Sequence, residues 1–253
     1  MVDYEIRGRV ALLTINRPEA RNAVNGAVAN GMEEAIDRLE ADDDVWVGIV
    51  TGTGPVFSAG ADLKAIASGE AAALQTKRGG FAGIARRERT KPLIAAVNGP
   101  AYAGGCEIVL SCDLVVASTE AKFGIPEVKR SLVAAAGGLF RLPRALPKNV
   151  AMELALTGDP IDAQRAYDLG LVNRLCEPGA LIHTALALAD QITANAPLAV
   201  RASREIVLKG MLADDDDAWR ITNEAFAAVA SSEDFGEGPR AFIEKRAPQW
   251  KGR

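Results

Sequence analysis

The stretch 92–113 constrains the fold more than any other part of the chain. Its first residues, 92–97, form an apolar run with the length and residue types of a buried β-strand. The sequence Asn98-Gly99-Pro100 then ends the strand, because proline cannot donate to a sheet ladder and glycine permits a tight turn. The pair Gly104-Gly105 opens a predicted helix. A buried strand, a turn and a helix in this order are typical of an α/β fold.

The start of this helix has features of a catalytic site. A helix N-terminus presents unpaired backbone N–H groups and the positive end of the helix dipole, and glycine lets a ligand oxygen approach the backbone. Glu107 lies three residues after Gly104, about one turn on and on the same face. A solvated first-turn glutamate is the common alternative. However, Glu107 lies between Cys106 and Ile108, and a carboxylate in apolar surroundings usually has a functional role.

Composition limits the class of protein. The chain has 253 residues, 49% hydrophobic and 25% charged, as expected of a globular protein with a large core. Its net charge of −4 argues against nucleic acid or an anionic membrane as the main partner. No apolar run approaches the roughly 20 residues that span a bilayer, and the first residues show no signal-peptide pattern.

Cysteine and histidine usage restricts the chemistry. Three cysteines without Cys-x-x-Cys spacing favour reduced thiols and a cytoplasmic location. His183 is the only histidine, which nearly excludes histidine-based metal clusters and Ser-His-Asp triads. No Gly-x-Gly-x-x-Gly motif follows a predicted strand, so we also expect no nicotinamide cofactor. The chain is therefore predicted to need neither a metal nor a cofactor.

Strands and helices alternate over the first part of the chain. An amphipathic helix is predicted from Val24, with Asn22 as its cap. Residues 65–90 show no clear core pattern and are predicted to form a mobile flap or irregular helix, a common place for substrate specificity. The other strands are predicted at residues 10–15, after a hairpin turn at Gly8, and at residues 46–51 and 114–117.

Two further segments carry candidate site residues. Residues 57–63, Phe-Ser-Ala-Gly-Ala-Asp-Leu, also place small residues between a strand and a helix. Backbone donors on two such neighbouring junctions can point at one oxygen, as in an oxyanion hole, although an ordinary turn also explains this segment. Residues 122–127 end in Glu127, next to Pro126, which restricts the backbone. A solvated residue in a first helical turn is again the alternative.

The last part of the chain is predicted to be mostly helical, apart from a strand at 171–175. Pro197 is placed as the first residue of a helix that ends at Gly210, and the acidic run 214–217 favours another helix N-terminus. We therefore expect an α/β domain with a helical appendage, divided into a core of residues 1–195 and a helical region of residues 196–253.

The sequence resembles the crotonase, or enoyl-CoA hydratase/isomerase, superfamily in motifs spread over nearly the whole chain. These motifs are Asn16-Arg17-Pro18 with Asn22-Ala23, residues 57–64, residues 91–99, residues 104–107, residues 123–127, Gly137-Gly138 with Arg141-Leu142, and residues 241–246. The resemblance implies an α/β fold, a crotonase-like spiral of repeated ββα units with a C-terminal helical trimerisation region. It also implies a homotrimer or a dimer of trimers.

The resemblance also implies roles for individual residues. The backbone N–H groups of Ala61 and Gly104 match the oxyanion hole of the family, and Glu107 and Glu127 match the acid–base positions of true hydratases. Phe242 and Lys245 match positions that reach the coenzyme A of an adjacent subunit. The positions where family members hold coenzyme A or the substrate further include Arg21, Ala23, Ala59, Asp62, Leu63, Lys64 and Gly138.

The predicted function is that of an enoyl-CoA hydratase, a hydro-lyase that reversibly adds water to a 2-enoyl-CoA thioester, as in the β-oxidation of fatty acids. Two carboxylates beside one water can share its activation and the protonation of the α-carbon. Leu139-Phe140 replaces the usual Thr-Gln, and this segment and residues 79–83 look more like carnitinyl-CoA dehydratases. The nature of the acyl group therefore stays open.

Three alternatives remain at this point. The first is a hydratase of the carnitinyl-CoA dehydratase type. The second is an acyl-CoA double-bond isomerase, which shuttles a proton with one carboxylate, although the presence of both Glu107 and Glu127 weighs against it. The third is a non-catalytic acyl-CoA-binding protein on the same fold. In each case the expected partner is an acyl-CoA thioester rather than nucleic acid or a membrane.

Overall fold

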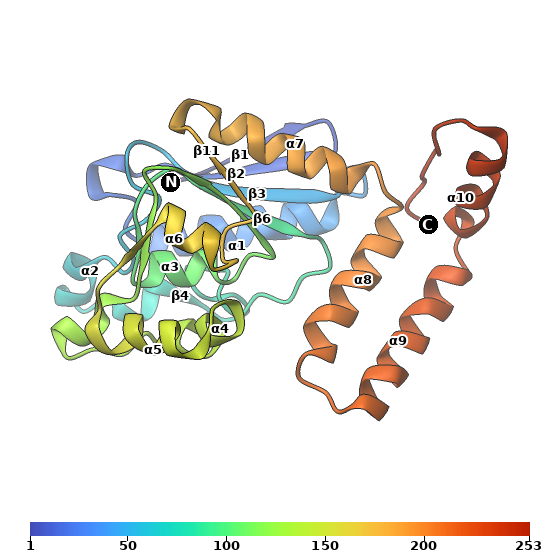
Figure 1. Cartoon of the computed structure of the whole chain (residues 1–253). Coiled ribbons are helices and arrows are strands. Elements are labelled where there is room, and N and C mark those ends of the chain that lie inside the picture. Colours follow the sequence, from blue (N-terminus) through green and yellow to red (C-terminus); the bar gives the residue numbers. More distant parts are fainter.

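A six-stranded sheet with helices on both faces forms the centre of the computed structural model, which describes residues 1–253 (Figure 1). Its strands are β1 (Val2–Arg7), β2 (Val10–Ile15), β3 (Val47–Gly52), β6 (Leu93–Val97), β8 (Leu114–Ser118) and β11 (Arg174–Cys176). They lie in the order β1-β2-β3-β6-β8-β11. The predicted hairpin at Gly8 joins β1 and β2 antiparallel, and all other neighbours are parallel.

The sheet is buried on both faces. Helix α1 (Gly26–Ala41) covers one face and α7 (Leu181–Thr193) the other (Figure 1). Along β6, Leu93, Ala95 and Val97 belong to the core on the α1 side. The alternate residues Ile94 and Ala96 belong to the core on the α7 side. Because side chains alternate between the two faces, burial of both explains why these parallel strands are continuous apolar runs.

The predicted cap of the first long helix is wrong. Asn25, not Asn22, caps α1, and its Oδ1 accepts a hydrogen bond from a backbone N–H in the first turn at 3.0 Å. The Asn22 side chain is fully buried instead. It accepts from the N–H of Arg17 at 2.9 Å and donates to the carbonyl groups of Thr53 and Val56. Asn22 therefore joins two loops that are distant in sequence.

Two smaller sheets lie beside the main one. Their strands are β7 (Ala101–Tyr102), β9 (Lys122–Gly124) and β10 (Ile161–Asp162) in one, and β4 (Gln75–Thr76) and β5 (Gly80–Phe81) in the other. The segment 65–90 contains the end of α2 (Leu63–Ala67), the 3₁₀ turn η2 (Ala71–Leu74) and the β4–β5 hairpin. Its irregular character is confirmed, while its mobility stays a prediction.

Short helices connect the strands, and longer ones follow them. The predicted helix at Gly104 is confirmed as α3. The helices are α3 (Gly104–Val109), α4 (Gly138–Ala145), α5 (Lys148–Thr157), α6 (Ala163–Asp168), α8 (Pro197–Gly210), α9 (Asp215–Ala230) and α10 (Glu233–Glu244). Short 3₁₀ helices are η1 (Pro18–Ala20), η3 (Pro126–Arg130) and η4 (Pro178–Ala180). The strand predicted at 171–175 begins three residues later, as β11.

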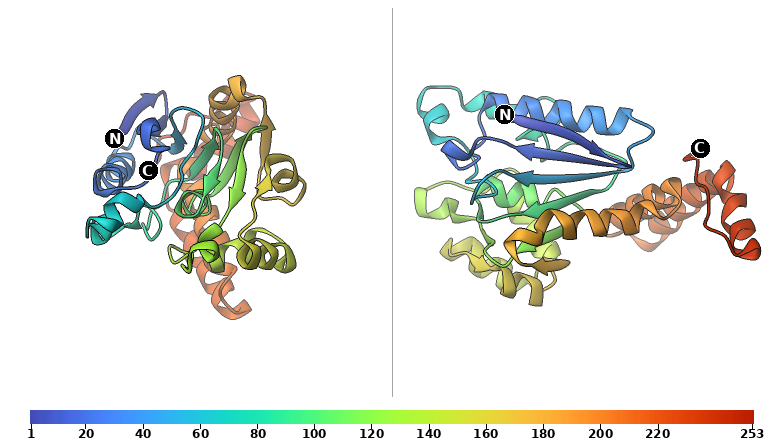
Figure 2. Two further views of the ribbon diagram at one scale, coloured as in Figure 1. Left: turned by 90° about the vertical axis from the view of Figure 1, so that its left-hand side faces the viewer. Right: turned by 90° about the horizontal axis from the view of Figure 1, so that it is seen from above.

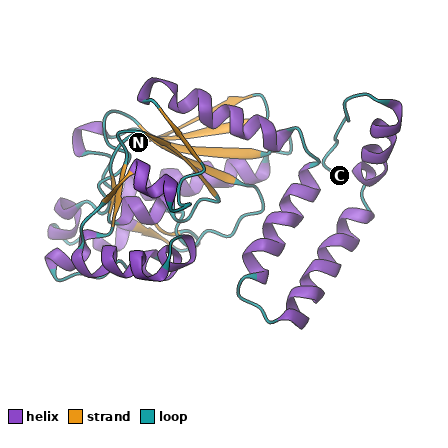
Figure 3. Ribbon diagram, viewed as in Figure 1, coloured by secondary structure: helices purple, strands orange, loops and turns teal.

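Helices α8, α9 and α10 form a C-terminal arm, residues 196–253, that projects from the body (Figures 1 and 2). The arm contains helices and loops but no strand (Figure 3). Pro197 begins α8 as predicted, and Asp214 caps α9 by accepting from the N–H of Asp217 at 2.9 Å. No helix of the structure combines the length and apolar character required to cross a membrane.

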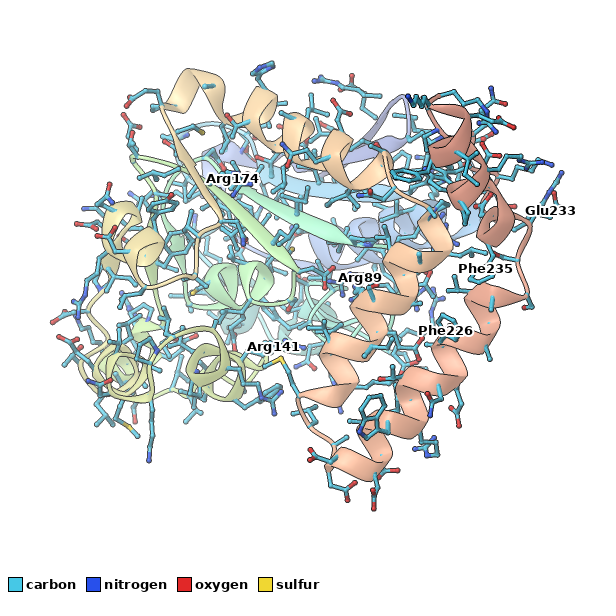
Figure 4. All side chains as sticks on the ribbon, turned by 45° about the vertical axis from the view of Figure 1, so that its right-hand side comes forward. Arg89, Arg141, Arg174, Phe226, Glu233 and Phe235 are labelled. Atoms are coloured by element: carbon cyan, nitrogen blue, oxygen red, sulfur yellow. The ribbon has the colours of Figure 1, made fainter.

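A charged cluster attaches the arm to the body. The guanidinium of Arg204, on α8, donates to the carbonyl oxygen of Arg89 at 2.7 Å and pairs with Asp113 at 3.0 Å. Arg89 lies beside α8 and also pairs with Asp113 at 3.0 Å (Figure 4). Within the arm, the rings of Phe226 and Phe235 pack edge to face at 6.3 Å (Figure 4). Polar contacts of Arg204 therefore help to hold the arm against the body.

Candidate active site

A cavity of about 1270 Å³ lies at the sheet edge where β3 and β6 end. Because parallel strands place their carboxyl ends at one edge, the loops that follow these strands meet there. Segments 17–23, 75–86 and 126–141 complete the walls. Ten of the predicted site residues line the cavity: Arg21, Ala23, Ala59, Ala61, Asp62, Leu63, Lys64, Gly104, Glu107 and Glu127.

Neither of the two predicted oxyanion donors has a hydrogen-bond acceptor within the chain. They belong to Ala61, in the loop after β3, and to Gly104, the first residue of α3. A parallel β-bridge between Ser58 and Ala101 joins the two loops. A methyl group on Gly60 would lie 2.8 Å from the nitrogen of Gly104, so the loops touch at this glycine. Two free donors therefore lie close together, an arrangement that can stabilise an oxyanion.

The residue before α3 has a strained backbone. Ala103 has φ 52° and ψ −128°, a conformation that residues with a Cβ rarely adopt. Its N–H donates to the carbonyl oxygen of Gly124 at 2.9 Å, which holds the turn in place. Strain of this kind persists where the surrounding structure over-determines it, and it concentrates at functional sites. Here the strained turn immediately precedes the free N–H of Gly104.

Glu107 is a buried carboxylate on α3. Only 3% of the residue is exposed, and its Oε1 accepts a hydrogen bond from the N–H of Gly138 at 2.8 Å. Burial raises the pKa of Glu107, and the backbone N–H groups of Gly138 and Ala136, with the positive charge of Arg141, offset only part of this effect. The common alternative, a solvated first-turn glutamate, is therefore excluded by the structure.

Glu127 has different surroundings. It lies in the first turn of η3, directly after Pro126, and one of its oxygens, Oε2, is buried without a hydrogen-bond partner. Burial, with a contribution from the negative charge of Glu107, raises the pKa of Glu127 to about 7. A carboxyl group that titrates near neutral pH can exchange protons under physiological conditions. The two glutamates thus share one cavity but differ in their local hydrogen bonding.

A salt bridge without a local signal in the sequence stabilises the wall of the cavity. Arg17 Nη1 donates to Asp62 Oδ2 at 2.6 Å, and the same atom donates to the carbonyl oxygen of Ala23 at 3.0 Å. Asp62 also caps α2 by accepting from the N–H of Lys64 at 2.9 Å. The hydrogen bond from Arg17 is the main cause that lowers the pKa of Asp62. Asp62 therefore has a structural partner in addition to its place in the cavity wall.

The remaining predicted site residues do not line this cavity. Gly138 lies behind Glu107 and contacts it through the hydrogen bond described above. Phe242 and Lys245 lie at the end of α10 in the C-terminal arm. Phe242 is 86% exposed and touches no part of the cavity of its own chain. A role for Phe242 and Lys245 at the site of a neighbouring chain stays a prediction.

Several residues that line the cavity were not predicted. Arg141, on α4, donates to the carbonyl oxygen of Ala85 at 2.7 Å and to Ser111 Oγ at 3.1 Å (Figure 4). The ring of Phe81 lies against Gly104, where an added methyl group would be 2.4 Å away. Arg141 belongs to the family motif Gly137-Gly138 with Arg141-Leu142, although no role was predicted for it. No local signal in the sequence indicated the contact between Phe81 and Gly104.

The structure contains no group of three or more histidine, cysteine, aspartate or glutamate side chains that could hold a metal ion. Its three cysteines are free. Independence from metals and cofactors was expected from composition and stays a prediction.

Comparison with known proteins identifies the family. The family model for enoyl-CoA hydratase/isomerase matches residues 5–253. A mevalonyl-coenzyme A hydratase of Aspergillus fumigatus is 41% identical over 96% of this chain and 91% of its own length. A carnitinyl-CoA dehydratase of Proteus mirabilis is 40% identical over 98% of this chain and 97% of its own.

A solved structure extends the comparison to the fold. The crystal structure of an enoyl-CoA hydratase from Mycobacterium tuberculosis superimposes with a TM-score of 0.96 at 49% identity, covering 100% of this chain and 99% of that one. The predicted crotonase-like α/β fold is thereby confirmed. The chain belongs to the enoyl-CoA hydratase/isomerase family, the crotonase superfamily.

Proposed function

We propose that this enzyme reversibly adds water to a 2-enoyl-CoA thioester and forms a 3-hydroxyacyl-CoA. The observation that carries the proposal is the pairing of two glutamates in one cavity with two free backbone donors. Addition of water to a conjugated thioester needs a base for the water, an acid for the α-carbon and donors for the oxygen that gains charge. The cavity contains one group for each task.

The thioester carbonyl oxygen binds to the N–H groups of Ala61 and Gly104 in this proposal. Negative charge develops on that oxygen as water adds to the double bond, so the two donors bind the transition state more tightly than the substrate. Removal of one such donor typically costs about 3–4 kcal/mol. The cations Arg21 and Lys64 line the cavity beside Ala61 and suit the phosphates of coenzyme A.

Glu107 acts as the general base. Its carboxylate takes a proton from water while the water oxygen bonds to C3 of the enoyl group, and the electrons of the double bond move onto the thioester oxygen. The hydrogen bond from Gly138 and the charge of Arg141 favour the ionised form that a base requires.

Glu127 acts as the general acid. As the carbonyl reforms, its carboxyl group gives a proton to C2, which completes the addition of water. A pKa of about 7 keeps a large fraction of Glu127 protonated at neutral pH, and the absence of a partner at Oε2 does not favour its ionised form. After each turnover Glu107 loses its proton and Glu127 regains one by exchange with solvent.

Crotonyl-CoA provides the direct test. Loss of absorbance at the enoyl band on addition of the enzyme is the expected result, with 3-hydroxybutyryl-CoA as the product. Migration of the double bond without hydration would favour the isomerase alternative. Binding of CoA thioesters without turnover of any enoyl substrate would favour a non-catalytic binding protein. Both outcomes would contradict the hydratase proposal.

We further propose that the enzyme is a trimer or a dimer of trimers, located in the cytoplasm. Large apolar side chains on the arm support association, since Trp219 is 66%, Phe226 62% and Phe242 86% exposed in the single chain. Phe242 and Lys245 would then reach the coenzyme A of an adjacent subunit. Full activity of a monomer at micromolar concentration would contradict this arrangement.

A further inference from the structure

Arg86 lines the cavity but has no partner. Its side chain is exposed at the cavity wall and forms no ion pair and no hydrogen bond within the chain. The two nearest arginines of the same segment behave differently, because Arg78 and Arg87 both pair with Asp37 on α1, Arg87 at 2.6 Å. Among the three arginines of segment 75–87, only Arg86 forms no ion pair with a carboxylate of the chain, and only Arg86 lines the cavity.

Arg86 belongs to the wall near the reacting groups rather than to the wall that carries Arg21 and Lys64. Its aliphatic stem packs on Gly80, where an added methyl group would lie 2.8 Å from it. The next residue, Phe81, contacts Gly104, and the residue before Arg86 accepts a hydrogen bond from Arg141. This wall lies next to the oxyanion donors and the two glutamates, so the acyl group of the proposed substrate is expected to extend along it.

The carboxylates that line the cavity do not neutralise Arg86. Asp62 is held by Arg17 at 2.6 Å, and Glu19 lies 4.0 Å from the same arginine. Glu107 accepts from a backbone N–H, and Glu127 has a raised pKa and no ion-pair partner. A guanidinium without an internal counter-ion is suited to a planar anion, because it offers several N–H donors in a fork that matches a carboxylate.

We propose that Arg86 recognises an anionic group at the far end of the acyl chain. The preferred substrates would be 2-enoyl-CoA thioesters whose acyl chain ends in a carboxylate. Chains that end in a quaternary ammonium group are disfavoured, because two like charges would meet beside Arg86. This inference rests on the proposed hydratase function and specifies its substrate class.

Three thioesters of coenzyme A test the proposal: crotonyl-CoA as the neutral reference, glutaconyl-CoA with a terminal carboxylate, and crotonobetainyl-CoA with a terminal trimethylammonium group. Wild-type enzyme is expected to hydrate glutaconyl-CoA with the highest kcat/KM of the three. In Arg86→Gln, the ratio of kcat/KM for glutaconyl-CoA over crotonyl-CoA should fall roughly 10- to 100-fold, the range of a charge-assisted hydrogen bond. Arg86→Lys should retain part of the ratio, and Arg86→Glu should shift preference toward crotonobetainyl-CoA.

Lys77→Gln is the matched control. Lys77 is an exposed residue of the β4–β5 hairpin, which precedes Arg86 in the chain, and it does not line the cavity. Its replacement by glutamine removes the same charge. In Lys77→Gln, the ratio of kcat/KM for glutaconyl-CoA over crotonyl-CoA should equal that of the wild type. An unchanged ratio in folded Arg86→Gln, or equal loss in Lys77→Gln, would overturn the role of Arg86 while leaving hydration intact. If the wild-type enzyme hydrated none of the three thioesters, the proposed hydratase function would be contradicted instead.

Discussion

Replacement of Glu127 by glutamine separates chemistry from folding, because activity and stability should change in opposite directions. Glutamine keeps the size of the side chain but cannot exchange a proton. A general acid typically contributes 10²–10⁴-fold to the rate, so we expect kcat for crotonyl-CoA hydration to fall by about that factor. The wild-type profile of kcat/KM should decline above a pH of about 7, where Glu127 loses its proton. The variant should lack this decline.

The stability change follows from the same pKa. Burial raises the pKa of Glu127 in the folded protein from 4.5 to about 7, so the folded state binds more protons than the unfolded state between these values. Stability therefore falls as pH rises through this range and is lowest above pH 7. A shift of this size corresponds to at most about 3 kcal/mol, and partial exposure of the carboxyl reduces the expected cost to about 1–2 kcal/mol.

Glutamine does not ionise, so the variant avoids this cost. Unfolding in denaturant at pH 8 should show Glu127→Gln to be about 1–2 kcal/mol more stable than the wild type. Near pH 4 the difference should vanish, since the wild-type carboxyl is then protonated in both states. Glu120→Gln is the control, because Glu120 is exposed and lies outside the cavity; it should change neither activity nor the pH dependence of stability.

Two results would refute the reasoning. A folded Glu127→Gln enzyme with near-normal hydration of every enoyl-CoA tested would exclude Glu127 as the acid. A stability difference that is the same at pH 4 and pH 8 would show that Glu127 is not held with a raised pKa in the folded protein.

Three further predictions concern other parts of the site. Gly104→Ala should lower kcat roughly 10²-fold or more, because the new methyl group would lie 2.4 Å from the ring of Phe81 and displace the oxyanion donor; a normal kcat would contradict the oxyanion role. Asp62→Asn should lower the free energy of unfolding at pH 7 by about 2 kcal/mol, since it removes the charge that pairs with Arg17. That loss should shrink as pH falls, because the pKa of Asp62 is lowered in the folded state, and a loss independent of pH would refute the explanation. Treatment with EDTA should leave hydration unchanged, whereas loss of activity restored by a divalent ion would reveal a metal requirement.

The order of strands and helices was predictable from the sequence because its signals are local. The apolar run 92–97 and the Asn98-Gly99-Pro100 turn specify β6 and its end without reference to distant residues. Pro197 likewise marks the start of α8, and the acidic run 214–217 the start of α9, through effects within one helical turn. These features, together with the family motifs, were sufficient to place Glu107 and Glu127 in one candidate site.

The properties of that site depend on contacts between residues that are distant in sequence. Asn22 was expected to cap a helix, but its hydrogen bonds to Thr53 and Val56 make it a loop connector. The salt bridge between Arg17 and Asp62 spans 45 residues and leaves no periodic signal in the sequence.

The tertiary structure also decides which charged groups remain without partners. Arg86 and Arg87 are neighbours in sequence, yet Arg87 pairs with Asp37 on α1, whereas Arg86 lies in the cavity wall. The pKa of Glu127 likewise depends on how completely other segments exclude water from it. Local sequence sets the secondary structure, whereas burial and charge pairing arise only when separate segments pack together.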